Sequence, residues 1–292
     1  MANNHRIYAK GIALAIIVGA LPFLLCAHAY ASEQADSVPA QGARKWLDDY
    51  KQPVGFTYSL QATLNTTYIW RGLYVGGLNI QPEASVGYGG AYVSVWGNIG
   101  ATTWTFAGFL PEIDISVGFA RWGLNASVTY IHLFNRPFFD FSNRPDGGNT
   151  LEVGVRYTVS SKLPLSVYWA TRVAASDGYL NEAGDTIRPY STYIELSYTH
   201  HFPYDISLRG AVGITPWRSL YTGYQRGFAV QNIEVRLAKE WSLSTHCGMK
   251  LQGVLSVNPS ALAADRDSGK WLPDTPENQS VNANIGVSVY WK

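Results

Sequence analysis

Residues 281–291 read VNANIGVSVYW, and this stretch decides the fold class. Apolar side chains occupy every second position, while Asn, Gly, Ser and Tyr fill the positions between them. Strict alternation indicates a β-strand with one apolar and one polar face, because successive side chains of a strand point to opposite sides. Residues 54–72, VGFTYSLQATLNTTYIWRG, repeat the pattern, and we interpret 54–71 as one long strand.

The same alternation recurs between these two stretches and predicts about twelve strands in all. They lie near 54–71, 80–88, 91–101, 111–120, 123–134, 149–159, 163–174, 190–199, 205–215, 227–238, 242–256 and 280–292. Short connections alternate along the chain with long ones at 72–79, 102–110, 135–148, 175–189, 216–226 and 257–279. Short periplasmic turns that alternate with long outer loops, on an even number of strands, are typical of outer-membrane barrels. We therefore expect an all-β, transmembrane, antiparallel up-and-down β-barrel.

Two of the short connections predict strand pairing in detail. A two-residue turn at Gly89 and Gly90 pairs Glu83 with Trp96, because Gly-Gly supplies the positive φ angles that tight hairpin turns need. A three-residue loop at 239–241 would pair Glu234 with His246.

The N-terminus predicts export from the cytoplasm. Arg6 and Lys10 precede an apolar run at 11–25, and the small residues of AHAYAS at 27–32 offer cleavage after Ala29 or Ala31. We expect a cleaved signal peptide at 1–31, a periplasmic leader at 32–53 and the barrel at 54–292, in the bacterial outer membrane with both termini in the periplasm. The net charge of +1 over 292 residues gives no reason to expect a nucleic acid partner.

The charged residues of the predicted strands all fall on the polar face. They are Arg71, Glu83, Glu112, Asp114, Glu152, Arg156, Arg172, Glu195, Arg209, Glu234, Arg236 and Lys250. A charge that faces lipid at the midplane costs about 2–4 kcal/mol, so these residues are predicted to line the lumen. They could form a charge-selective constriction or a salt-bridge network that satisfies the interior. Six basic and six acidic residues favour mutual pairing over strong selectivity.

Three tryptophans, Trp70, Trp169 and Trp291, are predicted members of an aromatic girdle at the membrane interfaces. An outer-membrane hydrolase would need a serine and a base within hydrogen-bond reach. His132 is the histidine on the apolar face near an outer loop, and Ser142 lies in the loop that follows. No serine adjoins His132 on that face, and His246 would point into the lumen. We expect no enzyme activity, no cofactor and no metal site.

Three stretches resemble a known family: NTTYIWRGL (65–73), PEASVGYGGAYVSVWGNIG (82–100) and PEIDISVGFARWGLNASVTYIH (111–132). They are similar to an uncharacterised family of porin-like, exported Gram-negative proteins of the TorF or Gcw type. The resemblance covers about 58–134, and Lys292 after Trp291 departs from an aromatic C-terminus. It implies a porin-like channel for small hydrophilic solutes, in contact with outer-membrane lipid. The alternatives are a non-conducting structural or surface-binding barrel and a lipid-active hydrolase; the sequence leaves the oligomeric state open.

Overall fold

The computed structural model describes residues 55–100, 112–134, 136–145, 147–160, 162–224, 227–261 and 280–291. Twelve of its strands form one closed barrel. They are β1 (Phe56–Asn65), β4 (Asn79–Tyr88), β5 (Ala91–Gly100), β6 (Glu112–Arg121), β7 (Leu124–Leu133), β8 (Thr150–Thr158), β9 (Leu165–Ala175), β12 (Thr192–Phe202), β13 (Ile206–Thr215), β14 (Ala229–Ser242), β15 (Cys247–Val257) and β16 (Val281–Trp291). The predicted signal peptide and leader lie outside the described residues.

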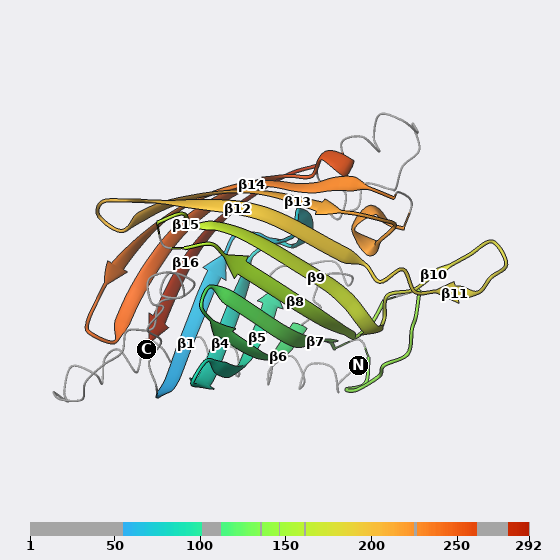
Figure 1. Ribbon diagram of the computed structural model, residues 1–292, viewed down its shortest axis with the longest axis horizontal. Helices are drawn as coiled ribbons and strands as arrows, with labels where there is room; N and C mark the ends of the chain where they lie inside the picture. The colour runs from blue at the N-terminus through green and yellow to red at the C-terminus, as the bar shows by residue number, and fades with distance from the viewer. Residues whose placement is uncertain are drawn as a thin grey trace, which may run out of the picture.

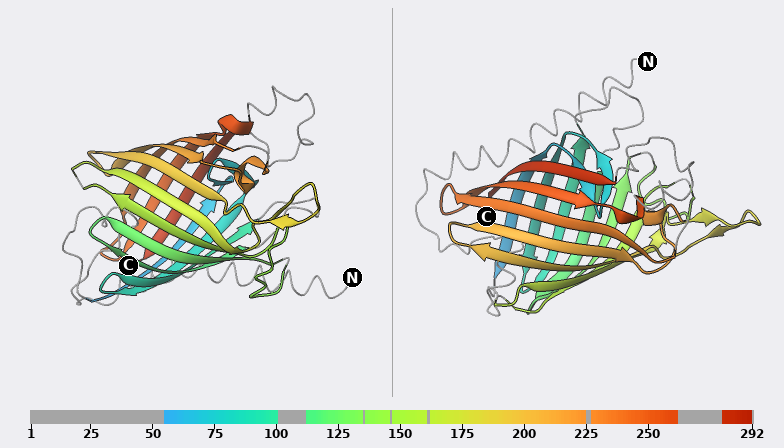
Figure 2. Two further views of the ribbon diagram at one scale, coloured as in Figure 1. Left: turned by 45° about the vertical axis from the view of Figure 1, so that its right-hand side comes forward. Right: turned by 90° about the horizontal axis from the view of Figure 1, so that it is seen from above.

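Each barrel strand pairs antiparallel with its neighbours in chain order, and β1 closes the ring by pairing with β16. Leu60 lies opposite Trp291, and Asn65 lies opposite Gly286. Figures 1 and 2 show the ring of tilted strands, with the C-terminus at the end where β1 begins. This confirms the predicted fold of about twelve antiparallel strands.

The outer face of the barrel is apolar and the inner face is polar. Val117, Leu196 and Ile285 point outward with 59%, 51% and 59% of their surface exposed. Between such positions lie buried polar side chains, as where the hydroxyl groups of Thr63 and Ser288 meet at 2.9 Å on the inside. A soluble barrel has the opposite arrangement, with its apolar side chains inside. An apolar exterior around a polar interior suits a barrel that spans a membrane.

The turn at Gly89 and Gly90 has positive φ at both residues, and it pairs Glu83 with Trp96 as predicted. The predicted loop at 239–241 is wrong, because these residues continue β14 and pair with β15 as far as Ser242 with Gly248. The connection is 243–246, where the Ser244 hydroxyl accepts the N–H of Cys247 at 3.1 Å. Glu234 therefore lies opposite Ser256 rather than His246.

Within the described residues, four short strands and one 3₁₀ turn are not part of the barrel wall. They are β2 (Tyr68–Trp70), β3 (Leu73–Gly76), β10 (Tyr179–Leu180), β11 (Thr186–Ile187) and the 3₁₀ turn η2 (Leu220–Thr222). The β10–β11 hairpin projects beyond the long-connection end of the barrel (Figure 1). Among the described residues, no helix has the length and apolar character to span a bilayer.

Candidate functional site: the barrel interior and its inner hairpin

The charged residues predicted for the lumen, apart from Arg71, occupy inner positions of the barrel strands. They are Glu83 on β4, Glu112 and Asp114 on β6, Glu152 and Arg156 on β8, Arg172 on β9, Glu195 on β12, Arg209 on β13, Glu234 and Arg236 on β14, and Lys250 on β15. Some of their side chains reach partners on strands that are not neighbours, such as Arg156 on β8 to Glu195 on β12 at 3.9 Å. Such contacts between strands that are not neighbours are made inside the barrel.

The predicted first strand is too long, because β1 leaves the wall after Asn65. Asn65 pairs with Asn79, so the thirteen intervening positions, 66–78, form an insertion between paired strands. Within it β2 and β3 pair only with each other, through Ile69 with Tyr74 and Trp70 with Leu73. We call residues 66–78 the inner hairpin.

A two-residue turn joins the two strands of the inner hairpin. Arg71 has φ 52° and Gly72 has φ 84°, which is the combination that a tight type I′ turn needs. A Cβ on Gly72 would overlap the backbone carbonyl of Gln231 on β14, so glycine is also required by this close approach. The sequence pair Arg-Gly is thus a hairpin turn, where the continuous-strand interpretation placed a strand end.

The inner hairpin crosses the interior of the barrel. At its base, the Thr67 N–H donates to Asn284 on β16 at 3.1 Å. Further along, the Tyr68 hydroxyl donates to Glu112 on β6 at 3.2 Å, and its ring lies 5.7 Å from that of Trp96 on β5. The Gly72 carbonyl accepts from Asn282 of β16 at 3.4 Å. Contacts with strands on several sides of the ring hold the hairpin inside.

Arg71 fixes the tip of the hairpin. Its guanidinium makes two parallel bonds to the Glu152 carboxylate, at 2.7 and 2.6 Å, and donates to the Tyr168 hydroxyl at 3.0 Å and to the Tyr221 hydroxyl. The Arg71 and Glu152 side chains are only 10% and 7% exposed. Bidentate geometry of this kind gives the strongest arginine–carboxylate interactions.

Aromatic rings surround the same guanidinium. Its central carbon lies 4.7 Å from the centre of the Trp70 ring, 5.2 Å from Tyr193 and 5.6 Å from Tyr168. Burial alone would lower the pKa of Arg71, but the charge of Glu152 outweighs it and holds the pKa well above its usual value. Arg71 therefore keeps its positive charge inside the barrel.

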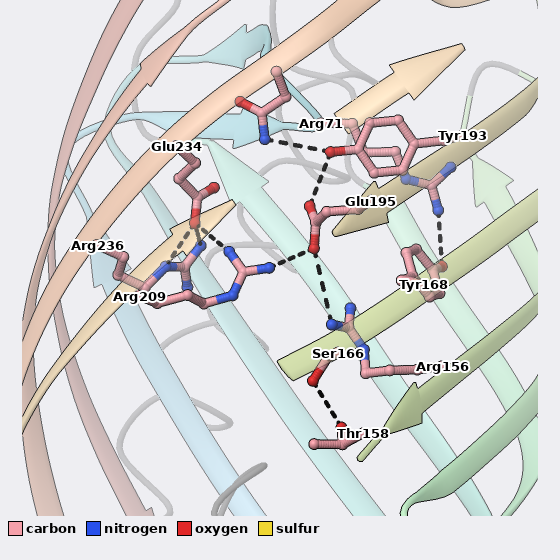
Figure 3. Close-up of polar contacts among 11 residues, drawn as sticks. Arg71, Arg156, Thr158, Ser166, Tyr168, Tyr193, Glu195, Arg209, Glu234 and Arg236 are labelled. Carbon is pink, nitrogen blue, oxygen red and sulfur yellow. Dashed lines mark hydrogen bonds and ion pairs between the residues drawn. The ribbon is translucent and has the colours of Figure 1, made fainter. Parts of the chain in front are cut away.

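A second cluster lies on the same side of the interior, on β8, β12, β13 and β14 (Figure 3). We call Arg156, Glu195, Arg209, Glu234 and Arg236 the arginine cluster. Arg209 bridges both carboxylates, with Nη1 2.7 Å from Glu234 and Nη2 in contact with Glu195. Arg236 adds its Nε to the same Glu234 oxygen at 3.1 Å. These ion pairs lie side by side on one part of the wall. They are an instance of the predicted pairing between basic and acidic residues of the interior.

Carboxylates gather on the opposite side of the ring. Glu83 lies opposite Trp96 in the register, and Trp96 lies opposite Asp114, so β4–β6 bring these groups together with Glu112. In the closed ring of twelve strands, β5 is six strands away from β13. The interior is therefore divided into a wall rich in arginine and a wall rich in carboxylate.

The three predicted girdle tryptophans have different positions. Trp70 is wrong as a girdle residue, because it lies in the inner hairpin with its ring 5.3 Å from Tyr221. Trp291 faces outward near the short-turn end and stacks on Tyr58 at 5.0 Å. Trp169 faces outward near the middle of β9, between Val155 and Ile194.

Sequence reasoning missed two outward tryptophans, Trp122 and Trp241, that lie near the short-turn end. Arg121 stands over the Trp122 ring at 4.6 Å, and Lys239 lies 5.5 Å from that of Trp241. It also missed the tyrosines around Arg71. Tyr168 and Tyr193 alternate with outward residues in their strands, so the sequence could have predicted that they point inward. Tyr221 lies in a long connection that has no periodic pattern.

His132 does not form a catalytic pair with Ser142. Its ring is 2% exposed, its Nδ1 is bonded to Asn149 at 2.9 Å, and the Phe138 ring covers it at 3.8 Å between ring centres. The Ser142 hydroxyl donates instead to Asp140. Within the described residues, no group of three or more His, Cys, Asp or Glu side chains could hold a metal ion.

Together, a closed antiparallel barrel, an apolar outer face and a charged interior define the architecture of a transmembrane β-barrel of the outer-membrane class.

Several solved structures are similar to this chain. The NanC porin has a TM-score of 0.47 at 12% identity, covering 81% of this chain and 100% of that chain. The KdgM porin has a TM-score of 0.41 at 7% identity, covering 80% and 98%. The COG4313 outer membrane channel from Pseudomonas putida F1 has a TM-score of 0.42 at 10% identity, covering 89% and 99%. No family model and no curated protein matches, so the TorF-type resemblance stays a prediction.

Proposed function

We propose that the protein is a porin-like channel of the bacterial outer membrane, for passive diffusion of small hydrophilic solutes. The observation that carries this proposal is the polarity of the closed barrel, whose exposed valines and leucines lie outside while Arg, Glu, Asp, Asn and Ser side chains line the inside. Lipid satisfies the outer face, whereas water and polar solutes, together with the ion pairs of the interior, satisfy the inner face. The proposed pore-lining residues are those predicted from the sequence: Arg71, Glu83, Glu112, Asp114, Glu152, Arg156, Arg172, Glu195, Arg209, Glu234, Arg236 and Lys250.

The inner hairpin sets the narrowest part of the proposed channel. Twelve strands about 4.8 Å apart and tilted by about 40° close into a barrel roughly 24 Å wide between backbones. Side chains reduce that width to about 10 Å before the hairpin is counted. The hairpin contacts with β5, β6, β8, β14 and β16 narrow the path further. Ions and small polar molecules fit this opening, and folded proteins do not.

The proposed orientation places both termini of the barrel chain in the periplasm. Phe56 begins β1 opposite Tyr88, beside the short Gly89–Gly90 turn, and Trp291 ends β16 at the same end. Short turns face the periplasm in outer-membrane barrels. A cleaved signal peptide at 1–31 and a leader at 32–53 fit this orientation.

The test is electrical and osmotic. Refolded protein in planar bilayers should produce discrete conductance steps, and liposomes that contain it should swell in small sugars but not in large dextrans. Complete silence at every voltage, together with no swelling, would refute the channel and favour a non-conducting barrel. The inner hairpin is the observation that favours this second candidate, because it crosses the interior.

A lipid-active hydrolase is the remaining alternative, and the position of His132 argues against it. The ring is enclosed by Phe138 and bonded to Asn149, so it cannot reach a lipid ester. We expect no hydrolysis of micellar phospholipid; hydrolysis that His132→Ala abolishes would reverse this conclusion.

A further inference from the structure

The arginine cluster presents its positive groups to the interior and buries its negative ones. The side chains of Arg156 and Arg236 are 39% and 37% exposed, whereas those of Glu195 and Glu234 are 9% and 10% exposed. Arg209, which lies between them, is 21% exposed. An equal count of charges in the sequence therefore does not describe the surface that a solute meets.

The hydrogen bonds explain this asymmetry. One Glu234 oxygen accepts from Arg209 at 2.7 Å and from Arg236 at 3.1 Å. The Glu195 carboxylate accepts from Arg209 through one oxygen and from the Tyr193 hydroxyl, at 2.9 Å, through the other. Each carboxylate is thus surrounded by donors, so it positions the guanidinium groups instead of facing the interior.

The guanidinium groups keep donors for a further partner. Each guanidinium has five N–H donors in a planar fork, and Arg156 uses its flat face on the Tyr168 ring at 4.6 Å. Its nearest carboxylate oxygen, on Glu195, is 3.9 Å away, which is too long for a hydrogen bond. Three cations share two carboxylates, so the cluster carries a net charge of +1 (+3 − 2).

The cluster also lies next to the constriction. Tyr168 receives a hydrogen bond from Arg71 of the inner hairpin at 3.0 Å and packs against Arg156. Figure 3 shows Arg71 of the inner hairpin next to Tyr168 and Arg156 of the wall, with Glu195, Arg209, Glu234 and Arg236 beside them. A solute that passes the hairpin therefore meets these guanidinium groups.

We propose that the arginine cluster is the selective site of the interior and that it binds small oxyanions, carboxylates or phosphates. The fork of a guanidinium matches the two oxygens of either group, and a charged lining selects ions by sign. This inference rests on the proposed channel function for its role in transport, but binding itself requires no conduction.

The first experiment measures ion selectivity. Under a gradient of dilute KCl, where screening is weak, the reversal potential should show preference for chloride over potassium. One positive unit charge about 5 Å away in a water-like medium favours a monovalent anion about fourfold and disfavours a monovalent cation by the same factor. The double variant Arg156→Gln/Arg236→Gln should lose this preference, and Arg121→Gln, on the outer face, should keep it. Cation preference in the unaltered protein, or unchanged selectivity in the double variant, would overturn the inference.

The second experiment measures binding without conduction. The folded protein in detergent micelles is titrated by calorimetry with citrate and, separately, with inorganic phosphate at low ionic strength. We expect at least one of these anions to bind, and at least tenfold weaker binding in the double variant. The anion that binds more tightly identifies the oxyanion class, and no binding of either one overturns the inference. Binding without conductance would refute the channel and leave the oxyanion site standing.

Discussion

The ion pair between Arg71 and Glu152 is the first interaction to test, because it holds the inner hairpin in place across the interior. Replacement of Arg71 by methionine keeps the unbranched stem of the side chain and removes both bonds to Glu152, at 2.7 and 2.6 Å. Breaking a buried ion pair from one side costs about 3–5 kcal/mol, because the remaining charge is left uncompensated. Glu152, with 7% of its side chain exposed, meets this condition.

The hairpin can relieve that cost by leaving its place, which lets water reach Glu152. Each 1.4 kcal/mol is a factor of ten in an equilibrium constant, so the undocked fraction should rise roughly 100- to several-thousand-fold. In single-channel recordings of Arg71→Met we expect long periods in a state of higher conductance that the unaltered protein visits rarely. In this variant Glu152 has lost its compensating charge, so protonation of Glu152 at low pH should lessen the effect.

Two further variants make the result specific. Arg121→Met removes an outward arginine that contacts Trp122, and it should leave the conductance states unchanged. Glu152→Gln combined with Arg71→Met removes the uncompensated charge, so it should destabilise the protein less than the sum of the two single changes. If Arg71→Met showed the conductance states and the thermal stability of the unaltered protein, Arg71 would not hold the hairpin.

Two other predictions concern the wall. Gly213→Ala would place a Cβ against the Tyr193 ring and should lower the free energy of unfolding by about 1–3 kcal/mol. Gly210→Ala has open space beside it and should be neutral or slightly stabilising. Denaturant unfolding in micelles compares the two variants, and equal midpoints would show that Tyr193 does not crowd position 213. Val95→Arg puts a charge on the outer face and should lower the stability in lipid by about 2–4 kcal/mol. Ser94→Arg, at the adjacent position on the inner face, should fold nearly normally. Equal refolding yields of the two variants in lipid vesicles would contradict the assigned faces.

The wall of the barrel could be predicted from the sequence because alternation is a local property. The inward or outward direction of each residue follows from parity once the strand is recognised, and the Gly89–Gly90 turn fixes the register of its two strands. The turn after β14 was misplaced because Lys239 to Trp241 alternate as a strand does. The connection is stabilised by the Ser244 hydroxyl, which accepts the N–H of Cys247, and such a bond cannot be read from the pattern of apolar residues.

The inner hairpin was missed for a different reason. Thr66 interrupts the apolar alternation between Leu64 and Tyr68, and β1 ends just before it, so a signal was present. One polar residue does not reveal that the chain turns inward. The Arg71–Glu152 bond joins positions 81 residues apart, and it depends on the path of a connection through the interior, which strand parity does not determine.

The contacts of Gly72 also have a consequence for the order of folding. This residue rests against Gln231 and accepts a hydrogen bond from Asn282, so two of its neighbours come from the last quarter of the chain. Loop closure over more than 150 residues is slow, and long-range contacts form after local ones. We therefore expect the hairpin to reach its final position only after the late strands have joined the ring. Until then, we expect the interior of the nascent barrel to be wider than in the finished molecule.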